Sequence, residues 1–376
     1  MRSIRSSGWF PPFAVIFAVQ LAPLGAQVQT ADSTAGPVVF SATGGSVTRD
    51  GLFTAGPTPG TFQVIASSRS ARDTAAITVA PPSDSEASRG IPFGPFDAWD
   101  VTGLKANTEV FTASIGSTNP KNILERIATA RAKGIKLILT MTGGGHQNYL
   151  TDGVFDMAKW QAKMDAYNTA SIASAVSGAV ADGTVIGNSV MDEPHVSGQG
   201  DGNTWGPRGT MTKARVDEMC AYVKRMFPTL PVGVVHPHHA FEPDNSYRVC
   251  DFLVDQYSSR QGDVTRFRDE GLAQARRDGI AIAFSINILN GGIQAKRRGP
   301  WDCSLDTTEG RGTHKPNCRM TAAQVREWGV LLGSAGCAFV LWRYDDVYMA
   351  NPDNQRAFAD VASVLATKPR RSCTRS

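Results

Sequence analysis

Hydrophobic and polar positions follow two different patterns, which divide the chain into two regions. Between residues 38 and 79, short runs of β-favouring residues alternate with turn residues, as in an all-β module. From about Gly90 to about Thr367, apolar runs alternate with segments whose apolar residues recur at helical spacing. We expect the apolar runs to be strands at Ile91–Phe96, Glu109–Ile115, Ile135–Thr142, Val185–Met191, Val232–His236, Asp251–Tyr257, Ile280–Asn287 and Ala338–Trp342.

The segments between these strands predict helices. Capping signals and apolar faces of helical period occur in Pro120–Lys133, Met157–Val180, Thr212–Phe227, Asp263–Arg277, Thr321–Gly333 and Asn354–Ala366. Eight strands alternating with helices are typical of a closed parallel barrel. An open doubly wound sheet is the alternative, but the glycine-rich phosphate-binding turn of a nucleotide-binding sheet does not follow the first strand. The predicted fold class is therefore α/β, a (β/α)8 TIM barrel with a small N-terminal all-β module.

The N-terminal region carries a resemblance of its own. Its stretches ATGGSVTRDGLFTAG, GTFQVIAS and DTAAITV resemble the second half of bacterial immunoglobulin-like repeats of surface and secreted proteins. The resemblance implies a spacer or adhesion role. The predicted divisions of the chain are a signal peptide (1–26), a partial immunoglobulin-like module (36–80), a linker (81–89), the barrel (90–367) and a basic tail (368–376).

The first 26 residues have the features of a secretory signal peptide in their usual order. Basic Arg2 and Arg5 precede the apolar run Phe13–Leu24, and small residues follow at Gly25 and Ala26. The apolar run is shorter than the roughly 20 residues that span a bilayer, and it contains a glutamine and a proline. We therefore expect a secreted or periplasmic protein with no membrane span after signal cleavage.

Composition and charge narrow the class of partner. With 41% hydrophobic residues, a chain of 376 residues can bury a sizeable core. The net charge of +4 is modest, and part of it lies in the tail from Lys368 to Arg375, which we expect to be a solvated end. No basic stripe interleaved with aromatic residues accompanies that tail, so we expect no nucleic-acid partner.

The six cysteines are an even number in a chain that we expect to be exported, so disulfides are allowed. Cys303 and Cys318 bracket one polar loop and are the predicted pair. Cys220 with Cys250 is a further candidate pair, and the remaining connectivity stays open.

In a (β/α)8 barrel the active site is formed by the loops after the strands, so polar residues in those loops are the candidate site residues. Five of the six histidines fall after the third, fourth and fifth predicted strands. Further polar residues follow the sixth, seventh and eighth strands. The candidates for binding substrate are His146, Asp192, His195, His236, His238, Tyr257, Asn287, Trp342, Arg343 and Asp345.

Glu193 is the first candidate for a catalytic residue. It ends a strand that reads VIGNSVMDEP, and a carboxyl group at an apolar barrel rim beside a second carboxyl can serve as a general acid. The MDEP motif resembles the Asn-Glu-Pro setting of the acid/base glutamate in clan A glycoside hydrolases, with Asp192 in place of the asparagine. Those enzymes also carry a nucleophilic glutamate at the end of the seventh strand, where this chain has SINILNGG with Asn287 and Asn290.

A second resemblance is to chitinase-type barrels. KLILTMTGGG resembles their glycine-rich third strand, Asp255-Gln256-Tyr257 their sixth-strand motif, and Trp342 the tryptophan of their eighth strand. Their fourth strand requires an aspartate two residues before the catalytic glutamate, where this chain has Met191. The substrate-assisted mechanism of that family is therefore not implied.

Glycoside hydrolysis requires a second carboxyl group across the scissile bond. Asp255 and Asp345 are the candidates, and Asp255 is preferred because the sixth strand faces the fourth across the predicted mouth. Flat aromatic rings near the mouth can pack on sugar rings. The candidate platforms are Trp99, Trp205, Trp301 and Trp342.

The sequence thus predicts an exported glycoside hydrolase that acts on an oligo- or polysaccharide, with Glu193 and Asp255 as the catalytic carboxyls and no cofactor. One alternative is a carbohydrate-binding or surface-attachment barrel that has lost its nucleophile. Another is a metal-dependent barrel hydrolase, because the clustered histidines and carboxylates supply zinc-type ligands. Metal-dependent barrel hydrolases typically carry a histidine pair on the first strand, and GPFDAW has none.

Overall fold

The computed structural model describes residues 15–20, 25–30, 37–49, 51–54, 60–69, 72–79, 90–100, 103–197, 204–241, 246–292, 303–304 and 317–375. The chain divides into two units, Met1–Ala87 and Ser88–Ser376. The predicted linker and Trp301 lie outside the described residues. No helix in the described ranges combines the length and the apolar character that a bilayer crossing requires.

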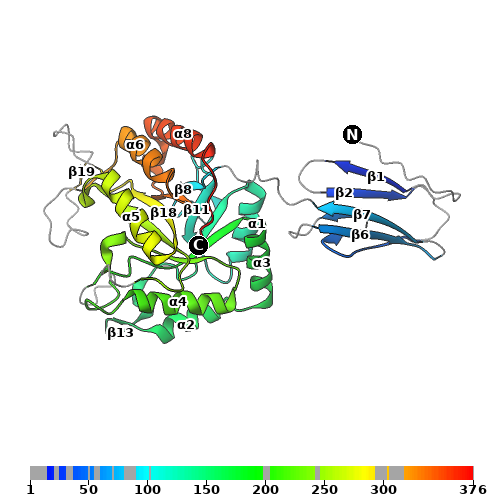
Figure 1. Cartoon of the computed structure of the whole chain (residues 1–376), viewed down its shortest axis with the longest axis horizontal. Helices are drawn as coiled ribbons and strands as arrows, with labels where there is room; N and C mark the ends of the chain where they lie inside the picture. Colours follow the sequence, from blue (N-terminus) through cyan, green and yellow to red (C-terminus); the bar gives the residue numbers. More distant parts are fainter. Residues whose placement is uncertain are drawn as a thin grey trace. The chain divides into compact units, whose positions relative to one another are not determined.

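The second unit contains an eight-stranded parallel sheet that closes on itself (Figure 1). In spatial order its strands are β11 (Ala113–Ser117), β12 (Lys136–Thr140), β15 (Val185–Asp192), β16 (Val232–Val235), β17 (Phe252–Tyr257), β18 (Ala281–Asn287), β21 (Phe339–Trp342) and β8 (Phe93–Pro95). A parallel bridge between Phe96 and Ile115 joins the last strand to the first. The predicted barrel is therefore confirmed, with each of its eight strands at the expected segment.

Alternation of side chains along the strands separates an inner from an outer layer. The inner cluster includes Ile115, Ile138, Val254 and Val340, which fill the interior of the barrel. A larger outer cluster lies between the strands and the helices, and it explains why these strands are apolar on both faces. We call the opening of the barrel at the carboxyl ends of its strands the mouth, and the residues at those strand ends form it.

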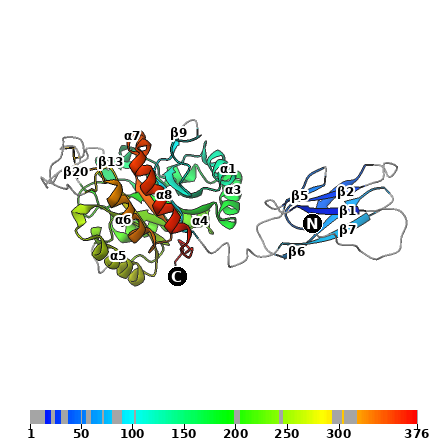
Figure 2. The ribbon, with the colours of Figure 1, turned by 90° about the horizontal axis from the view of Figure 1, so that it is seen from above.

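Eight α-helices in the described part of the unit surround the barrel (Figures 1 and 2). They are α1 (Ile123–Lys133), α2 (Met157–Asp165), α3 (Ala170–Ala181), α4 (Lys213–Met226), α5 (Val264–Asp278), α6 (Ala322–Gly333), α7 (Asp346–Ala350) and α8 (Pro352–Ala366). Helices α6 and α8 pack side by side.

The predicted helix Met157–Val180 is two helices rather than one. The break occurs because Thr169 has an extended backbone, and its hydroxyl accepts the Ile172 N–H as the N-cap of α3. The short helix α7 was not expected from the sequence. It begins at Asp345, whose side chain accepts the Tyr348 N–H at 2.8 Å.

The first unit is built from β-strands. They are β1 (Val15–Gln20), β2 (Gly25–Thr30), β3 (Val39–Ala42), β4 (Ser46–Val47), β5 (Leu52–Thr54), β6 (Gly60–Ser67) and β7 (Arg72–Val79). They form two antiparallel sheets, ordered β1-β2-β5-β4 and β3-β6-β7. Strands β1 and β2 lie in and just beyond the predicted signal peptide. The all-β character of the region is thus as expected, while its immunoglobulin-like identity and the cleavage of the signal stay predictions.

Two disulfides link distant parts of the barrel unit. Cys220 on α4 is bonded to Cys250, as the second candidate pair predicted, and Cys337 is bonded to Cys373. Cys318 is also disulfide-bonded, and Cys303 is its backbone partner in a two-stranded ladder. That register is compatible with the predicted Cys303–Cys318 pair.

The C-terminal tail does not form the solvated end that its charge suggested. Cys373 is buried in the inner cluster of the barrel. Arg375 donates hydrogen bonds to the carbonyl oxygens of Tyr247, Cys250 and Asp278. The basic residues therefore serve to anchor the tail to the unit, because guanidinium groups satisfy backbone carbonyls at the ends of elements.

Candidate active site

The mouth of the barrel receives polar side chains from several strands. Val254, Ala283 and Val340 belong to the inner cluster, so the residues two positions further along the same strands face inward as well. Those residues are Gln256, Ser285 and Trp342. Asn287 follows Ser285 on the inward face of β18, and its Oδ1 accepts the Asn290 N–H at 2.9 Å. The predicted residues Asn287 and Trp342 are therefore at the mouth.

The adjacent carboxyl groups of Asp192 and Glu193 lie at the end of β15. Val190 and Met191 both belong to the outer cluster, and the register with β16 shifts between Ser189 and Asp192, so regular alternation is interrupted just before the two carboxyls. The Glu193 N–H still donates to the Val235 carbonyl of β16 at 2.8 Å, which fixes the strand end. Glu193 itself has a left-handed backbone with a φ of 46°. Such a conformation is unusual for glutamate, and strained residues of this kind cluster at functional sites.

Asp192 is in an environment that favours its protonated form. Its Oδ1 is buried and has no hydrogen-bond partner in the described part of the chain. Burial, followed by the negative charges of Glu193 and Asp97, raises the pKa of the Asp192 carboxyl well above its usual range. A protonated carboxyl group can donate a hydrogen bond, which a carboxylate cannot.

Trp205 connects the loops that flank Asp192. Its indole Nε1 donates to the Asp192 carbonyl oxygen at 3.1 Å, and the centroids of its ring and the His146 ring are 4.0 Å apart. Because Trp205 is buried, its predicted role as a sugar platform is replaced by a supporting one. Trp99 is buried as well, whereas Trp342 is half-buried and packs edge-on against Phe96 at 4.9 Å.

Two of the predicted histidines are held neutral. Burial lowers the pKa of His236 to about 3, and its Nε2 and Nδ1 are hydrogen-bonded to the Tyr247 hydroxyl and the Pro237 carbonyl, each at 2.7 Å. Burial and the neighbouring His239 lower the pKa of His195 to about 4. The Nδ1 of His195 is buried and has no partner among the described residues, so it is available to a ligand. His236 is instead part of the core.

The low pKa of His236 predicts a loss of stability in acid. A histidine whose folded pKa lies below its ordinary value of 6.5 contributes stability above that value, and this is lost as the pH falls toward about 3. Between pH 7 and pH 5 the loss is roughly 2 kcal/mol for this residue. Urea unfolding at both pH values should show a smaller loss in a His236→Gln variant. Because the raised pKa values of Asp192 and Asp255 act with the opposite sign, the test is the difference between the two proteins. Equal losses would contradict the prediction.

Asp255 does not lie where a catalytic partner of Glu193 was expected. Its side chain is fully buried on the outer side of β17, where its two oxygens accept the His238 N–H at 2.8 Å and contact His238 Nδ1 at 2.9 Å. A Cβ atom on Gly271 of α5 would lie 2.2 Å from Asp255 Oδ2. Asp255 and His238 are therefore wedged between the barrel wall and α5, and the expectation that Asp255 faces Glu193 across the mouth is not met.

The pair of Asp255 and His238 behaves as a buried structural contact. Burial raises the pKa of Asp255, and His238 partly opposes that shift. Burial alone would lower the pKa of His238, but the hydrogen bond and charge of Asp255 outweigh it, so the pKa of His238 is raised. Glu270, half-exposed on α5, adds a contact of 3.7 Å to His238 Nε2.

Three further predicted residues have structural surroundings. Tyr257 is buried between Phe267 and Trp328, and its hydroxyl donates to the Gly262 carbonyl at 2.7 Å. Asp345 caps α7 and pairs with Arg319 at 3.6 Å rather than with Arg343. Arg343 is exposed after β21. Tyr257 and Asp345 are thus engaged in structural contacts, and Arg343 is the one of these three residues that is placed to bind a ligand.

Asp97 and Gln256 are further candidate site residues that the sequence analysis did not identify. Asp97 lies two residues beyond β8, and its N–H donates to the Ile115 carbonyl at 2.9 Å where the barrel closes. It is the first polar residue after the first predicted strand, in GPFDAW, and that position was the available signal. Gln256 could have been predicted to face the barrel interior, because it lies two residues after Val254 on the same strand and alternate residues of a strand share a face.

The histidines and carboxylates do not converge as a metal centre. In the described ranges no group of three or more His, Cys, Asp or Glu side chains is arranged to hold a metal ion. The reason is visible in the separate contacts of His236 with Tyr247 and of His238 with Asp255. The geometry of these residues does not favour the metal-dependent alternative.

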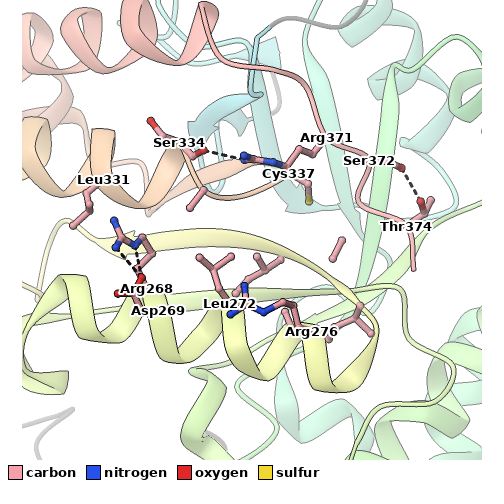
Figure 3. A pocket seen from close by; sticks show the side chains of 15 residues that line it. Arg268, Asp269, Leu272, Arg276, Leu331, Ser334, Cys337, Arg371, Ser372 and Thr374 are labelled. Carbon is pink, nitrogen blue, oxygen red and sulfur yellow. Dashed lines mark hydrogen bonds and ion pairs between the residues drawn. The ribbon is translucent and has the colours of Figure 1, made fainter. Parts of the chain in front are cut away.

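A cavity of about 680 Å³ lies at the other end of the barrel (Figure 3). It is bounded by α5, α6 and the C-terminal tail, next to the first residues of β18. Its arginines are already engaged in part, since Arg371 donates to the carbonyls of Ser334 and Gly336, and Arg268 pairs with Asp269. The cavity is therefore separate from the mouth and its carboxyl groups.

No family model matches the chain, and no curated protein matches it. The chain is similar to solved structures of glycoside hydrolases. A GH10 xylanase from termite gut that contains a bacterial Ig-like domain is 13% identical, with a TM-score of 0.45 over 87% of this chain and 93% of that one. A Cellulomonas fimi endo-β-1,4-mannanase is 15% identical, with a TM-score of 0.46 over 73% and 70%. A Rhizomucor miehei chitinase is 11% identical, with a TM-score of 0.44 over 72% and 99%. At these values the likeness establishes neither activity nor substrate.

Proposed function

We propose that the chain is an exported glycoside hydrolase that cleaves an oligo- or polysaccharide by carboxylate general acid–base catalysis. The observation that carries the proposal is the carboxyl pair of Asp192 and Glu193 at the end of β15, where the Asp192 Oδ1 is buried without a partner among the described residues and burial raises the pKa of that carboxyl. Active sites of (β/α)8 barrels form at this end of the strands.

In the proposed reaction the two carboxyl groups have different roles. Glu193, which lies one residue beyond the strand, donates its proton to the glycosidic oxygen as the bond to the anomeric carbon breaks. Asp192 remains protonated and donates a hydrogen bond to a sugar hydroxyl, which would satisfy its buried carboxyl group. The left-handed backbone at Glu193 holds its side chain in a conformation that an ordinary strand residue would not adopt.

The surrounding residues supply contacts for a neutral sugar. Trp342 is half-buried at the mouth and offers a flat ring to the apolar face of a pyranose. Asn287 and the neutral imidazole of His195 are hydrogen-bonding groups suited to hydroxyls. His146, held against Trp205, and the exposed Arg343 extend this surface in the proposal.

Export is supported by the disulfides and by the predicted signal peptide. Structural disulfides form and persist in oxidising compartments, and the barrel unit has the Cys220–Cys250 and Cys337–Cys373 bonds. An extracellular or periplasmic carbohydrate substrate is consistent with such a compartment.

A second candidate function is carbohydrate binding without catalysis. The observation that favours it is Asn287 at the end of β18, where clan A glycosidases place their nucleophilic carboxylate. A barrel of this kind would keep its aromatic and amide contacts with sugars and lack hydrolysis.

The proposal is tested with the purified mature protein on a panel of polysaccharides. Reducing-end release and pull-down binding are read together, and the Glu193→Gln variant controls for contaminating activity. Release by the wild-type protein and not by the variant supports the hydrolase and identifies the substrate class. Binding without release by either protein supports the attachment function instead. If the protein neither binds nor cleaves any member of the panel, that result counts against both functions.

A further inference from the structure

The proposed hydrolase requires a second carboxyl group, and the predicted candidates are engaged elsewhere. Asp255 is held by His238 on the outer side of β17, and Asp345 caps α7. The strand that carries the nucleophile in clan A enzymes ends here in Asn287. Asp346 after β21 accepts the Tyr344 hydroxyl, which leaves Asp97, two residues beyond β8, as the candidate for this role among the described carboxylates near the strand ends.

The backbone at Asp97 places this residue at the mouth. Phe96, directly before it, belongs to the inner cluster and packs against Trp342. Asp97 has a left-handed backbone with a φ of 57°, which interrupts the regular alternation of the strand. Its N–H is fixed on the Ile115 carbonyl, so the conformation is held by the closure of the barrel. Asp97 and Glu193 thus share the same uncommon backbone conformation at two strand ends of one mouth.

The charges around Asp97 and Asp192 differ in a way that separates their roles. Asp97 lies close enough to Asp192 for its charge to disfavour ionisation there. The half-buried Arg126, which lies over the Trp99 ring at 5.7 Å, also feels the charge of Asp97, because burial lowers the pKa of Arg126 and Asp97 partly opposes that shift. Asp192 thus has two carboxyls as charged neighbours, whereas Asp97 has a guanidinium among its neighbours, and unlike environments of this kind are how enzymes divide base and acid between paired carboxyls.

Buried polar atoms with no partner in the described residues occur along the wall between these two aspartates. Strands β11 and β12 separate β8 from β15. Thr118, the first residue after β11, has an unpartnered buried hydroxyl. The fully buried Asn188 accepts the N–H of Met141, the first residue after β12, at 3.1 Å, while its Nδ2 has no partner. Buried polar groups without partners are costly, so their presence here points to a polar ligand at this part of the mouth.

We propose that Asp97 is the second catalytic carboxylate and acts as the general base opposite Glu193. This inference rests on the proposed glycosidase function. Asp97 takes a proton from a water molecule, and the water oxygen forms a bond to the anomeric carbon. The glycosidic bond breaks with its electron pair moving to the leaving oxygen, which receives the proton of Glu193. Because the water attacks the anomeric carbon on the face opposite the leaving oxygen in a single step, the mechanism predicts inversion at the anomeric carbon.

The first experiment compares Asp97→Asn with a matched control, Asp152→Asn. Asp152 has a similar left-handed backbone, with a φ of 51°, but its side chain is exposed in the turn between β13 (Leu150–Thr151) and β14 (Val154–Phe155). Asparagine is well tolerated in this conformation, so both variants are expected to fold. Asp97→Asn should lower turnover on the panel substrate by about 10²- to 10⁴-fold, with Asp152→Asn unchanged. An Asp97→Asn variant with wild-type turnover would overturn the proposal.

Two further readouts separate a base from a merely structural residue. In Asp97→Gly, added azide should restore turnover, since azide can attack without a base. Proton NMR of the first product should show inversion, and retention would overturn the role of Asp97 as base.

Carbon-13 NMR of the Asp192 carboxyl tests the juxtaposition without relying on activity. The titration midpoint should move to lower pH in Asp97→Asn, because one neighbouring negative charge has been removed. If the wild-type protein cleaves polysaccharide and the Asp192 midpoint is the same in Asp97→Asn, the assignment of Asp97 is overturned while the proposed hydrolase function stands. If the wild-type protein releases no sugar from any substrate, the proposed hydrolase fails and the base role fails with it, whatever the Asp192 titration shows.

Discussion

Replacing Glu193 by glutamine is expected to lower turnover on polysaccharide by about 10²- to 10⁴-fold, which corresponds to roughly 3 to 5 kcal/mol in the activation barrier. Glutamine keeps the size and the hydrogen-bonding capacity of the side chain but cannot donate a carboxyl proton. The N–H of residue 193 will still bond to the Val235 carbonyl, because that contact belongs to the backbone. The variant should therefore fold as the wild-type protein does, and its loss should be in kcat.

The leaving group provides the discriminating measurement. An aryl glycoside with an acidic phenol needs little protonation, so its cleavage by Glu193→Gln should fall much less than the cleavage of a polysaccharide. Glu218→Gln is the matched control, since Glu218 is exposed on α4, remote from the strand ends. Equal losses on both kinds of substrate would argue that Glu193 does not act as the proton donor. An unchanged rate on polysaccharide would remove it from the mechanism.

The fold could be predicted in detail because its strands are buried on both faces. Runs such as Val232–Val235 and Phe339–Trp342 are apolar throughout, a pattern that is typical of a strand between two apolar layers. The break between α2 and α3 was missed because apolar spacing continues across Thr169. A single capping hydroxyl decides the boundary there, and threonine also occurs inside helices.

The site could be predicted only as a set of strand ends. Proximity to the end of a strand does not determine which side of the wall a side chain faces, and a shift of one residue reverses it. Asp255 and Tyr257 were therefore expected at the mouth and lie on the outer side, whereas Gln256 between them lies on the inner side. Asp97 escapes alternation altogether through its left-handed backbone, which the sequence around it does not announce.

The disulfides illustrate the same limit. Cys220 and Cys250 were a candidate pair from the sequence, and they are bonded. Cys337 and Cys373 could not be paired in this way, because the tail looked like a solvated basic end. What draws the tail in is the inner cluster at the base of the barrel, to which both cysteines belong, and this is a tertiary property.

The outer position of Asp255 leads to a second prediction, which separates stability from catalysis. Asp255→Ala should destabilise the barrel by about 3 to 5 kcal/mol, because it leaves the buried N–H and imidazole of His238 without their partner. The side chain also packs directly on α5, since a Cβ atom on Gly271 would lie only 2.2 Å from Asp255 Oδ2, so its removal leaves a gap at this contact. Urea unfolding of the wild-type protein and the variant at pH 7 measures the loss.

Glu270→Gln is the control for this prediction. Glu270 contacts the same imidazole at 3.7 Å but is half-exposed on α5, so water replaces the lost interaction and the unfolding midpoint should stay close to that of the wild type. Turnover per folded molecule should be retained in Asp255→Ala, measured at a temperature where the variant is still native. A variant with wild-type stability and abolished turnover would instead return Asp255 to the catalytic machinery. In that case Asp255 on β17, and not Asp97, would be the second catalytic carboxyl that acts with Glu193.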